Sequence, residues 1–532
     1  MNLCSTVLRL YFIAIVSLLA PAALTAQAGD DTSRSELPLE ERMEILEEEL
    51  EKVKLSKATK SFESVEGRGP AASAVYHAEE GLTWGGYGEV KYRDYKSSFR
   101  KDQTDVHRFI LYAGYRFNDW IVLNSEIEYE HAGFEKKTVG GSSVNSGEVF
   151  VEMAYIDFEF TKEVQLQLGL NLLPIGITNL RHEPTTFLAV ERSRTETNII
   201  PSTWREVGAI LHGTVGDVIQ YNTGAVTGPR ASGFSEGSWI RGGRQKGSLA
   251  LSEGWGYLAG MDFVGVNGLT VGGSYYMGES GQGEIAKSDW QDRIVNPIDT
   301  LRASDQTGLV GAYDTIVGNR NKTARIRAHI AEGHLEYNSG PVLVRALYAQ
   351  GWMSEEDTRA VNKATGNNVG QSVEGGYAEM GYNVLSFFDT SHKLYPFFRY
   401  ERLNTQKETV QRHLGGKEDI NDFVCGVVLQ GTCKVTTGSS VAGSSTVSNQ
   451  NLGIIANSTS LKEAYGVVGT PDRKNDRTIL TVGVAYFPTP NVVLKAEYEQ
   501  MDSKTDFNSD IEGLNPGNNK IDQLNVAVGF IF

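Results

Sequence analysis

The residues of this sequence that could do chemistry are mainly charged side chains in and between segments of alternating polarity. The candidates are Arg181, Glu191, Arg192 and Arg194 in the segment 173–203, together with Arg108 and Arg116 at alternate positions earlier in the chain. A guanidinium group is planar and can bind two oxygens of a carboxylate or phosphate at once. A ring of like charge in a narrow passage of low dielectric selects ions by their sign. Residues of these types could therefore select ions if the fold brings them together around a narrow passage.

Two other patterns suggest catalysis or metal binding, but the residues around them do not fit either function. Residues 233–237 match G-x-S-x-G, but they lie in a Gly/Ser-rich loop, whereas a nucleophile elbow needs a strand before it and a helix after it. Four side chains alternate like calcium ligands at Asp506, Asn508, Asp510 and Glu512. Ile511 occupies the position where an EF-hand loop needs glycine. We therefore expect no enzyme, no metal site and no other cofactor.

The composition excludes several classes of protein. The 532 residues have a formal net charge of -16, which argues against nucleic acid as a partner. The chain is too apolar for a disordered protein and too polar for a bundle of membrane helices, with 40% hydrophobic residues and 58 glycines. Three cysteines exclude a disulfide-stapled scaffold. Cys425 and Cys433 share the longest loop, so we expect a disulfide between them in an oxidising compartment.

The first residues predict export. Leu10 to Leu19 form an apolar run, and Ala26-Gln27-Ala28 has the small-x-small pattern that signal peptidase recognises. We interpret residues 1–28 as a signal peptide, with a single anchoring helix as the alternative. No later stretch approaches the ~20 apolar residues that a membrane-spanning helix needs.

Residues 29–66 predict a coiled-coil segment. Leu39, Leu46 and Val53 recur every seven residues, and Met43 and Leu50 interleave with them to form a short apolar seam. A helix of this length is marginal in water, so the seam favours oligomerisation, with a solvated charged spacer as the alternative. A Gly/Ala/Ser-rich linker, 67–81, follows.

From residue 82 to residue 532 the polarity alternates with a period of two. In 164–172, for example, every second residue is Val or Leu and the residues between are Gln, Gly or Asn. We interpret sixteen segments of this kind as strands. Such alternation fits either a soluble β-sandwich or a membrane barrel, in which the apolar face meets lipid.

The lengths of the connections separate the two folds. Short turns, such as 118–119 and 161–163, alternate with long connections, such as 173–203, 278–322 and 403–476. Short turns at one rim, long loops at the other and an even number of strands are typical of outer-membrane barrels. We therefore predict an all-β fold, a sixteen-stranded antiparallel transmembrane barrel preceded by a short periplasmic helix.

Several segments between residues 106 and 213 resemble the phosphate-selective porin O and P family. They are VHRFILYAGYRFNDWIVLNSEIEYE, VEMAYIDFEF, LQLGLNLLPIG, FLAVERS and REVGAILHG. The resemblance implies a homotrimeric sixteen-stranded porin whose loop 173–203 folds into the lumen and forms the constriction. The chain departs from that family in charge, because its lumen arginines are mixed with acidic residues such as Glu126, Glu128, Glu497 and Glu499.

The resulting expectation is a porin in the outer membrane, in contact with lipid, with the N-terminal segment in the periplasm. It would let small ions and hydrophilic solutes diffuse, with inorganic phosphate or other anions as the preferred class that the resemblance implies. A broadly permissive pore is the alternative that the mixed charges favour. An alternative from a different functional class is a structural or adhesive barrel whose long loops bind a surface partner.

Overall fold

A computed structural model describes most of the chain from residue 63 onward. The described residues are 63–96, 101–132, 136–139, 142–145, 147–285, 324–410, 434–435, 441–442, 471–504 and 519–532. The expected signal peptide, all but the end of the coiled-coil segment, and both cysteines of the expected disulfide lie outside the described residues.

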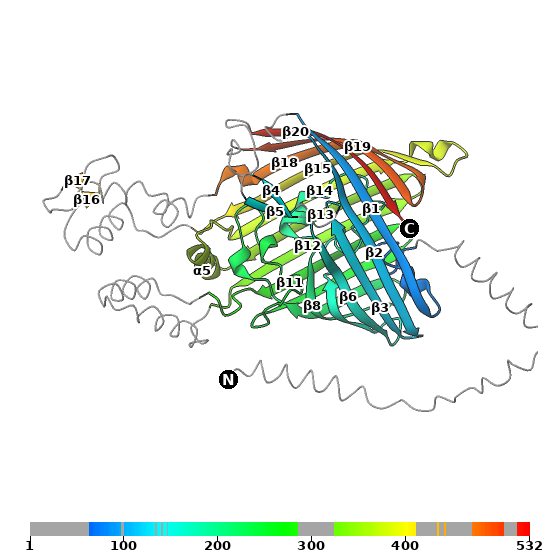
Figure 1. The fold of residues 1–532 in the computed structure, drawn as a ribbon, viewed down its shortest axis with the longest axis horizontal. Coiled ribbons are helices and arrows are strands. Elements are labelled where there is room, and N and C mark those ends of the chain that lie inside the picture. The colour runs from blue at the N-terminus through cyan, green and yellow to red at the C-terminus, as the bar shows by residue number, and fades with distance from the viewer. Residues whose placement is uncertain are drawn as a thin grey trace, which may run out of the picture. The chain divides into compact units, whose positions relative to one another are not determined.

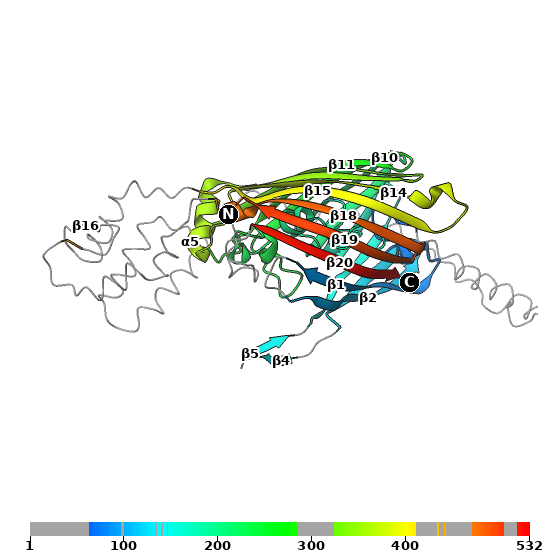
Figure 2. The ribbon, with the colours of Figure 1, turned by 90° about the horizontal axis from the view of Figure 1, so that it is seen from above.

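Sixteen antiparallel strands form one closed barrel (Figures 1 and 2). In order around the barrel they are β1 (Gly81–Tyr95), β2 (Gln103–Asn118), β3 (Ile121–Glu130), β6 (Val149–Glu159), β7 (Gln165–Leu172), β8 (Arg205–Val215), β9 (Ile219–Thr227), β10 (Trp255–Val266), β11 (Leu269–Glu279), β12 (Arg327–Ser339), β13 (Val342–Met353), β14 (Ser372–Tyr382), β15 (Lys393–Glu408), β18 (Asp476–Thr489), β19 (Val492–Ser503) and β20 (Lys520–Ile531). β20 pairs with β1 and closes the sheet, with Tyr87 opposite Ile531. The predicted fold class is confirmed, and each predicted strand corresponds to one strand of the barrel.

Three smaller elements lie outside this ring of strands. β4 (Lys136–Val139) pairs with β5 (Ser142–Asn145), and β16 (Lys434–Val435) pairs with β17 (Val441–Ala442). The helix α5 (Glu355–Thr365) follows β13, begins at the N-cap Ser354 and ends at Gly366, which adopts φ 77°. Among the described residues, no helix is both long enough and apolar enough to cross a membrane.

The barrel buries charge and exposes apolar side chains. On β19 the inward residues Lys495, Glu497 and Glu499 are 2% exposed each, whereas the outward residues Leu494 and Tyr498 are 42% and 41% exposed. Most other strands repeat this alternation, and β1, β9 and β11 show it less regularly. Soluble proteins show the opposite distribution, with ionised side chains at the surface. The period-two pattern of the sequence therefore corresponds to an apolar outer wall and a polar lumen.

The connections alternate in length as expected. Seven are short, and they are 119–120, 160–164, 216–218, 267–268, 340–341, 383–392 and 490–491. The eight connections that alternate with these are longer, except that 96–102 is shorter than 383–392. Two of the eight turn back into the barrel: 173–204 between β7 and β8, and 228–254 between β9 and β10.

The residues before β1 also enter the barrel. Residues 67–81 were expected to be a linker, but Arg68, Ala71, Ala72 and Ser73 are buried, and the chain forms a short 3-10 helix, η2 (Ala74–His77). Small side chains let this segment approach the wall closely, since Ala72 lies near enough for its carbonyl oxygen to accept a bond from Asn124 Nδ2 at 2.9 Å. The segment therefore fills part of the lumen as well as connecting to β1.

Candidate pore constriction

The loop 173–203 begins with residues that hold it inside the barrel. Leu173, Ile175 and Ile177 are at most 5% exposed and belong to the main apolar cluster of the interior. Gly176 has φ +75°, and a Cβ there would lie 2.9 Å from Glu196 Oε2. Glycine is needed because both the left-handed backbone and this close approach exclude a side chain. The turn at 174–176 therefore directs the loop inward.

Glu196 ties the two ends of the loop together. Its Oε2 accepts hydrogen bonds from Thr178 N at 2.7 Å and from Thr178 Oγ1 at 2.9 Å, and its Oε1 accepts one from Tyr377 on β14 at 2.6 Å. The carboxylate is buried, so these bonds replace the water that it loses. The loop is thereby joined to itself and to the wall.

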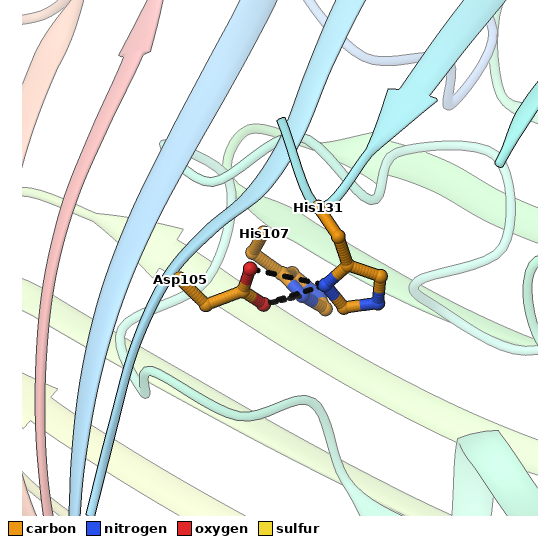
Figure 3. A group of neighbouring side chains, drawn as sticks. All are labelled: Asp105, His107 and His131. Atoms are coloured by element: carbon orange, nitrogen blue, oxygen red, sulfur yellow. Dashed lines mark hydrogen bonds and ion pairs between the residues drawn. The ribbon is translucent and has the colours of Figure 1, made fainter. Parts of the chain in front are cut away.

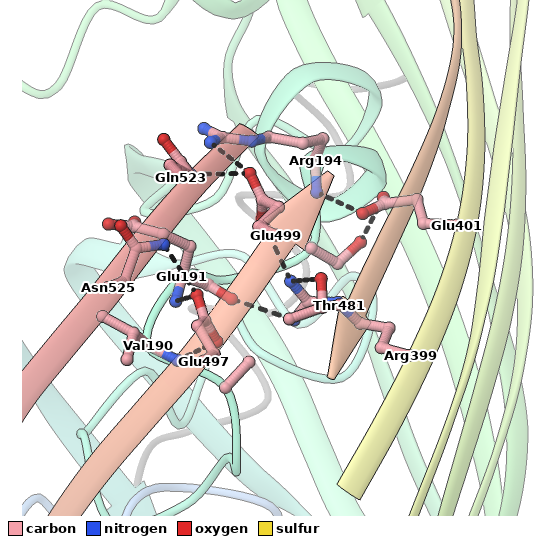
Figure 4. A network of polar contacts seen from close by, with 12 residues as sticks. Val190, Glu191, Arg194, Arg399, Glu401, Thr481, Glu497, Glu499, Gln523 and Asn525 are labelled. Carbon is pink, nitrogen blue, oxygen red and sulfur yellow. Dashed lines mark hydrogen bonds and ion pairs between the residues drawn. The ribbon is translucent and has the colours of Figure 1, made fainter. Parts of the chain in front are cut away.

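Wall carboxylates bind the tip of the loop (Figure 4). Glu401 on β15 accepts from Ser193 Oγ at 2.7 Å, from Arg194 N at 3.0 Å and from Thr195 N at 2.5 Å. Glu497 on β19 accepts from Val190 N at 2.6 Å. Buried backbone N–H groups of an irregular loop need partners, and charged acceptors form the stronger bonds. These acidic residues therefore position the loop in addition to setting the charge of the lumen.

The part of the loop before its tip contacts β12 and the segment before β1. Arg181 pairs with Glu336 on β12, at 2.8 Å between Nη2 and Oε2. Glu183 binds the segment before β1, because its carboxylate accepts from Ala71 N at 3.1 Å and from Ala72 N at 3.0 Å. The loop therefore crosses the lumen from wall to wall, as expected for a constriction.

A second loop, 228–254, forms hydrogen bonds to the loop 173–203. This contact was not predicted from the sequence. Arg241 Nη1 donates to Thr197 O at 2.7 Å, and Arg244 Nη1 donates to Pro201 O and Thr203 O at 3.0 Å each. The sequence feature that could have indicated this contact is Arg-Gly-Gly-Arg at 241–244, inside a long connection. The two glycines let both guanidinium groups approach backbone carbonyls.

The six predicted site residues do not all meet. Arg116 lies next to the short turn after β2 and pairs with Glu159 at 2.8 Å, away from the loop tip. Arg108 lies on β2, with Nε 3.6 Å from Glu89 Oε2. Glu191 pairs with Arg93 at 2.7 Å and with Lys91 at 3.5 Å, both on β1.

Arg192 lies among charges of both signs. Burial and then the nearby charge of Arg108 lower the pKa of Arg192, whereas Tyr87, Glu152 and Glu128 act in the opposite direction. Burial, followed by Arg244 and Arg192, lowers the pKa of Arg241 to about 9. Arg192 Nη1 is buried and has no hydrogen-bond partner among the described residues. Arginine side chains stay protonated in proteins, so Arg192, Arg241 and Arg244 place three cations at the loop.

Two cavities border the loops. One, of about 270 Å³, lies between residues 64–68, the start of the loop 173–203 and the strands β7 to β12, and its lining includes Arg181, His212 and His334. The other, of about 420 Å³, is lined by the loop 228–254 and Glu284. The lining of the first cavity is mixed, and that of the second is mainly polar.

The fold and the lumen define the class of this molecule, a closed sixteen-stranded β-barrel with a loop folded across its interior. No protein-family model matches the sequence. The chain belongs to the same family as an uncharacterized protein of Aquifex aeolicus (strain VF5), with 34% identity over 349 residues that cover 65% of this chain and 71% of that protein.

Several solved structures share the barrel architecture. OprB of Pseudomonas putida is 9% identical, with a TM-score of 0.45 over 85% of this chain and 94% of that one. OmpF of Salmonella typhi is 13% identical, with a TM-score of 0.44 over 85% of this chain and 98% of that one. DcaP, an outer membrane channel of Acinetobacter baumannii, is 10% identical, with a TM-score of 0.39 over 85% of this chain and 97% of that one. The likeness concerns architecture alone.

Proposed function

We propose that this chain is an outer-membrane porin, through which ions and small hydrophilic solutes diffuse passively. The observation that carries the proposal is the distribution of polarity around the closed barrel, with an apolar outer wall and a charged interior crossed by the loop 173–203. An exposed band of apolar side chains is stable against lipid, and a charged lumen retains water.

The preferred solute class in this proposal is a small anion, with inorganic phosphate as the member that the family resemblance suggests. Arg192 supports this preference, because its buried Nη1 has no hydrogen-bond partner in the described residues and Arg108, Arg241 and Arg244 add positive charge around it. Most other lumen cations are paired with acidic residues, such as Arg345 with Glu336. An unpaired guanidinium in a narrow lumen attracts oxyanions.

The assembly in this proposal is a homotrimer with residues 29–66 in the periplasm. The heptad spacing of residues 39–53 supports it, since a seam this short needs partner helices. The signal peptide 1–28 and the disulfide between Cys425 and Cys433 remain predictions from the sequence.

Single-channel recording in a planar lipid bilayer tests the channel function. We expect stable, repeatable conductance steps from purified protein whose barrel is folded, as judged by its heat-dependent migration on a gel. Folded protein that inserts into the bilayer without producing steps would contradict the proposal.

A plugged structural or adhesive barrel is the second candidate, and the segment 63–77 is the observation that favours it. Arg68, at 7% exposure, and Val75, at 2%, show that this segment packs tightly in the lumen. Recording from a variant that lacks residues 63–77 separates the two candidates. Steps that appear only after this deletion would support the plugged barrel.

A further inference from the structure

We propose that Glu126, Glu152 and His182 form a binding site for one divalent transition-metal ion, best matched by Zn²⁺, where the loop 173–203 meets the barrel wall. Glu126 lies on β3, Glu152 on β6 and His182 in the loop. One potential ligand atom from each of the three lies within 4.8 Å of the others. The proposal does not depend on whether the barrel conducts.

The distances within this group differ from those of an ordinary ion pair. His182 Nε2 is 3.6 Å from Glu126 Oε1 and 3.6 Å from Glu152 Oε2. A charge-assisted N–H···O bond measures about 2.7–2.9 Å. Two ligands on a tetrahedral Zn²⁺, each about 2.1 Å from the ion, are about 3.4 Å apart. The spacing of these three side chains therefore fits a shared cation better than a shared proton.

Two other lumen histidines have the shorter nitrogen–oxygen distances of ordinary histidine–carboxylate ion pairs. His212 lies 2.7 Å from Glu66 through Nδ1 and 3.0 Å from Asp157 through Nε2. His334 lies 2.9 Å from Glu332 through Nδ1 and 3.2 Å from Asp262 through Nε2. In both, each ring nitrogen faces its own carboxylate.

At His182, in contrast, one nitrogen faces two carboxylates. A single N–H cannot donate well to both, and the other nitrogen, Nδ1, is already bonded to Asn179 O at 3.0 Å. Metal-ligating histidines typically donate their second ring N–H to a backbone carbonyl or carboxylate, which fixes the ring and the tautomer. The bond to Asn179 has this form.

All three candidate ligands are buried and incompletely bonded. Glu126 and Glu152 are 0% exposed and His182 is 2% exposed. His182 Nε2, Glu126 Oε2 and Glu152 Oε2 have no hydrogen-bond partner among the described residues. Unbonded buried polar atoms are costly and need an explanation. A cation bound between His182 Nε2 and Glu152 Oε2 would satisfy those two atoms, and Glu126 would complete the site through Oε1, the oxygen that lies 3.6 Å from His182 Nε2.

The two carboxylates also have partners outside this group. Glu152 Oε1 accepts from Arg205 Nη1 at 3.3 Å, and Glu126 Oε1 accepts from the Tyr87 hydroxyl at 3.4 Å. Such outer partners orient metal ligands and tune their affinity. A donor set of one imidazole and two carboxylates suits Zn²⁺, and it also admits Mn²⁺ or Fe²⁺.

A second cluster at the mouth of the barrel is the competing location (Figure 3). Asp105, His107 and His131 also place three ligand atoms within 4.8 Å. There, however, His131 Nδ1 already bonds both oxygens of Asp105, at 2.9 and 3.0 Å. The three residues of this cluster are half-buried or exposed, whereas those of the other cluster are all buried. The buried cluster is therefore the better site.

The test measures zinc bound by the purified full-length protein. Because the ligands are buried, the protein is refolded from denaturant with ZnCl₂, dialysed extensively and assayed for metal. We expect one tightly bound zinc per chain, an increased Tm relative to protein refolded with chelator, and Co²⁺ substitution with the visible spectrum of nitrogen and oxygen ligands. Anomalous diffraction at the zinc edge would place the ion beside His182.

Matched variants locate the ion. Replacing both Glu126→Gln and Glu152→Gln keeps the side-chain volumes, and we expect zinc affinity to fall at least about tenfold. His131→Ala at the rim and His334→Gln in the lumen should retain the wild-type zinc content. No zinc above background in the folded wild-type protein would overturn the proposal and leave a proton on His182 as the occupant. Loss of zinc in His131→Ala alone would overturn it in favour of the rim cluster.

Discussion

At the scale of single residues, the lumen is a set of paired charges with one main exception. Acidic side chains such as Glu401 and Glu497 bind backbone N–H groups of the loop 173–203. Arg241 and Arg244 bind backbone carbonyls of the same loop. The hydrogen-bonding groups of these side chains are already occupied and interact less with a permeating ion. Arg192, in contrast, has an Nη1 without a hydrogen-bond partner among the described residues. Ion selectivity should therefore depend on Arg192 more than on the total charge of the lumen.

Replacing Arg192 with alanine tests this assignment. We expect the reversal potential under a KCl gradient to shift toward cation preference, because the variant removes a guanidinium whose Nη1 has no hydrogen-bond partner among the described residues. Arg192→Lys should keep most of the anion preference. Arg359→Ala, on the exposed face of α5 and 41% exposed at its side chain, is the matched control and should behave as the wild type. An unchanged reversal potential in Arg192→Ala would show that the constriction lies elsewhere.

At the scale of elements, the segment 63–77 is held by buried charges that respond to pH. Glu66 bonds His212 at 2.7 Å, Gln165 at 2.8 Å and Arg68 at 3.3 Å. Burial alone would raise the pKa of Glu66, but the hydrogen bond to His212 and the charge of Arg68 outweigh burial and lower that pKa to about 2. The docked segment therefore favours the ionised carboxylate.

The stability that Glu66 contributes should depend on pH with a definite sign. A carboxyl group whose pKa is lower in the folded state stabilises that state fully above its unfolded pKa of 4.5, and the contribution disappears as the pH falls toward 2. We expect wild type and Glu66→Gln to differ in urea-unfolding midpoint at pH 6, with the wild type more stable, and to converge between pH 4.5 and 2. A difference that stayed constant over this range would exclude a charged, docked Glu66.

At the scale of the whole molecule, the barrel exposes a broad apolar wall, and its assembly depends on what covers that wall. Outward residues such as Leu82, Met261 and Met380 are 55–59% exposed in the single chain. Lipid or a second copy of the chain would cover them. The heptads before the barrel favour the second copy for part of this wall.

Deleting residues 36–60 tests the proposed trimer. We expect the trimer to dissociate at a lower temperature on a gel, because the coiled-coil seam no longer adds its contacts, while the barrel itself remains folded. Replacing the same residues with a Gly/Ser linker of equal length controls for the change in chain length. Equal heat resistance of the wild-type and linker trimers would exclude a role for the coiled coil.

The sequence by itself determined the strands, their number and the side of the wall that each residue faces. In 164–172, for example, apolar and polar residues alternate, and β7 spans Gln165–Leu172. This information is local, because a side chain on a strand points to one face or the other according to its position along the chain. The length of each connection can likewise be read from the sequence, so the rim with short turns could be distinguished from the rim with long loops.

Only the tertiary structure decided what fills the lumen. It brought Glu401 to the loop tip, Arg241 and Arg244 to the carbonyls of the loop 173–203, and residues 63–77 into the barrel. The group of Glu126, Glu152 and His182 also comes from three separate elements, so no spacing in the sequence showed it. The physical reason is that irregular segments have no period, and their positions follow from which distant partners satisfy their buried polar groups.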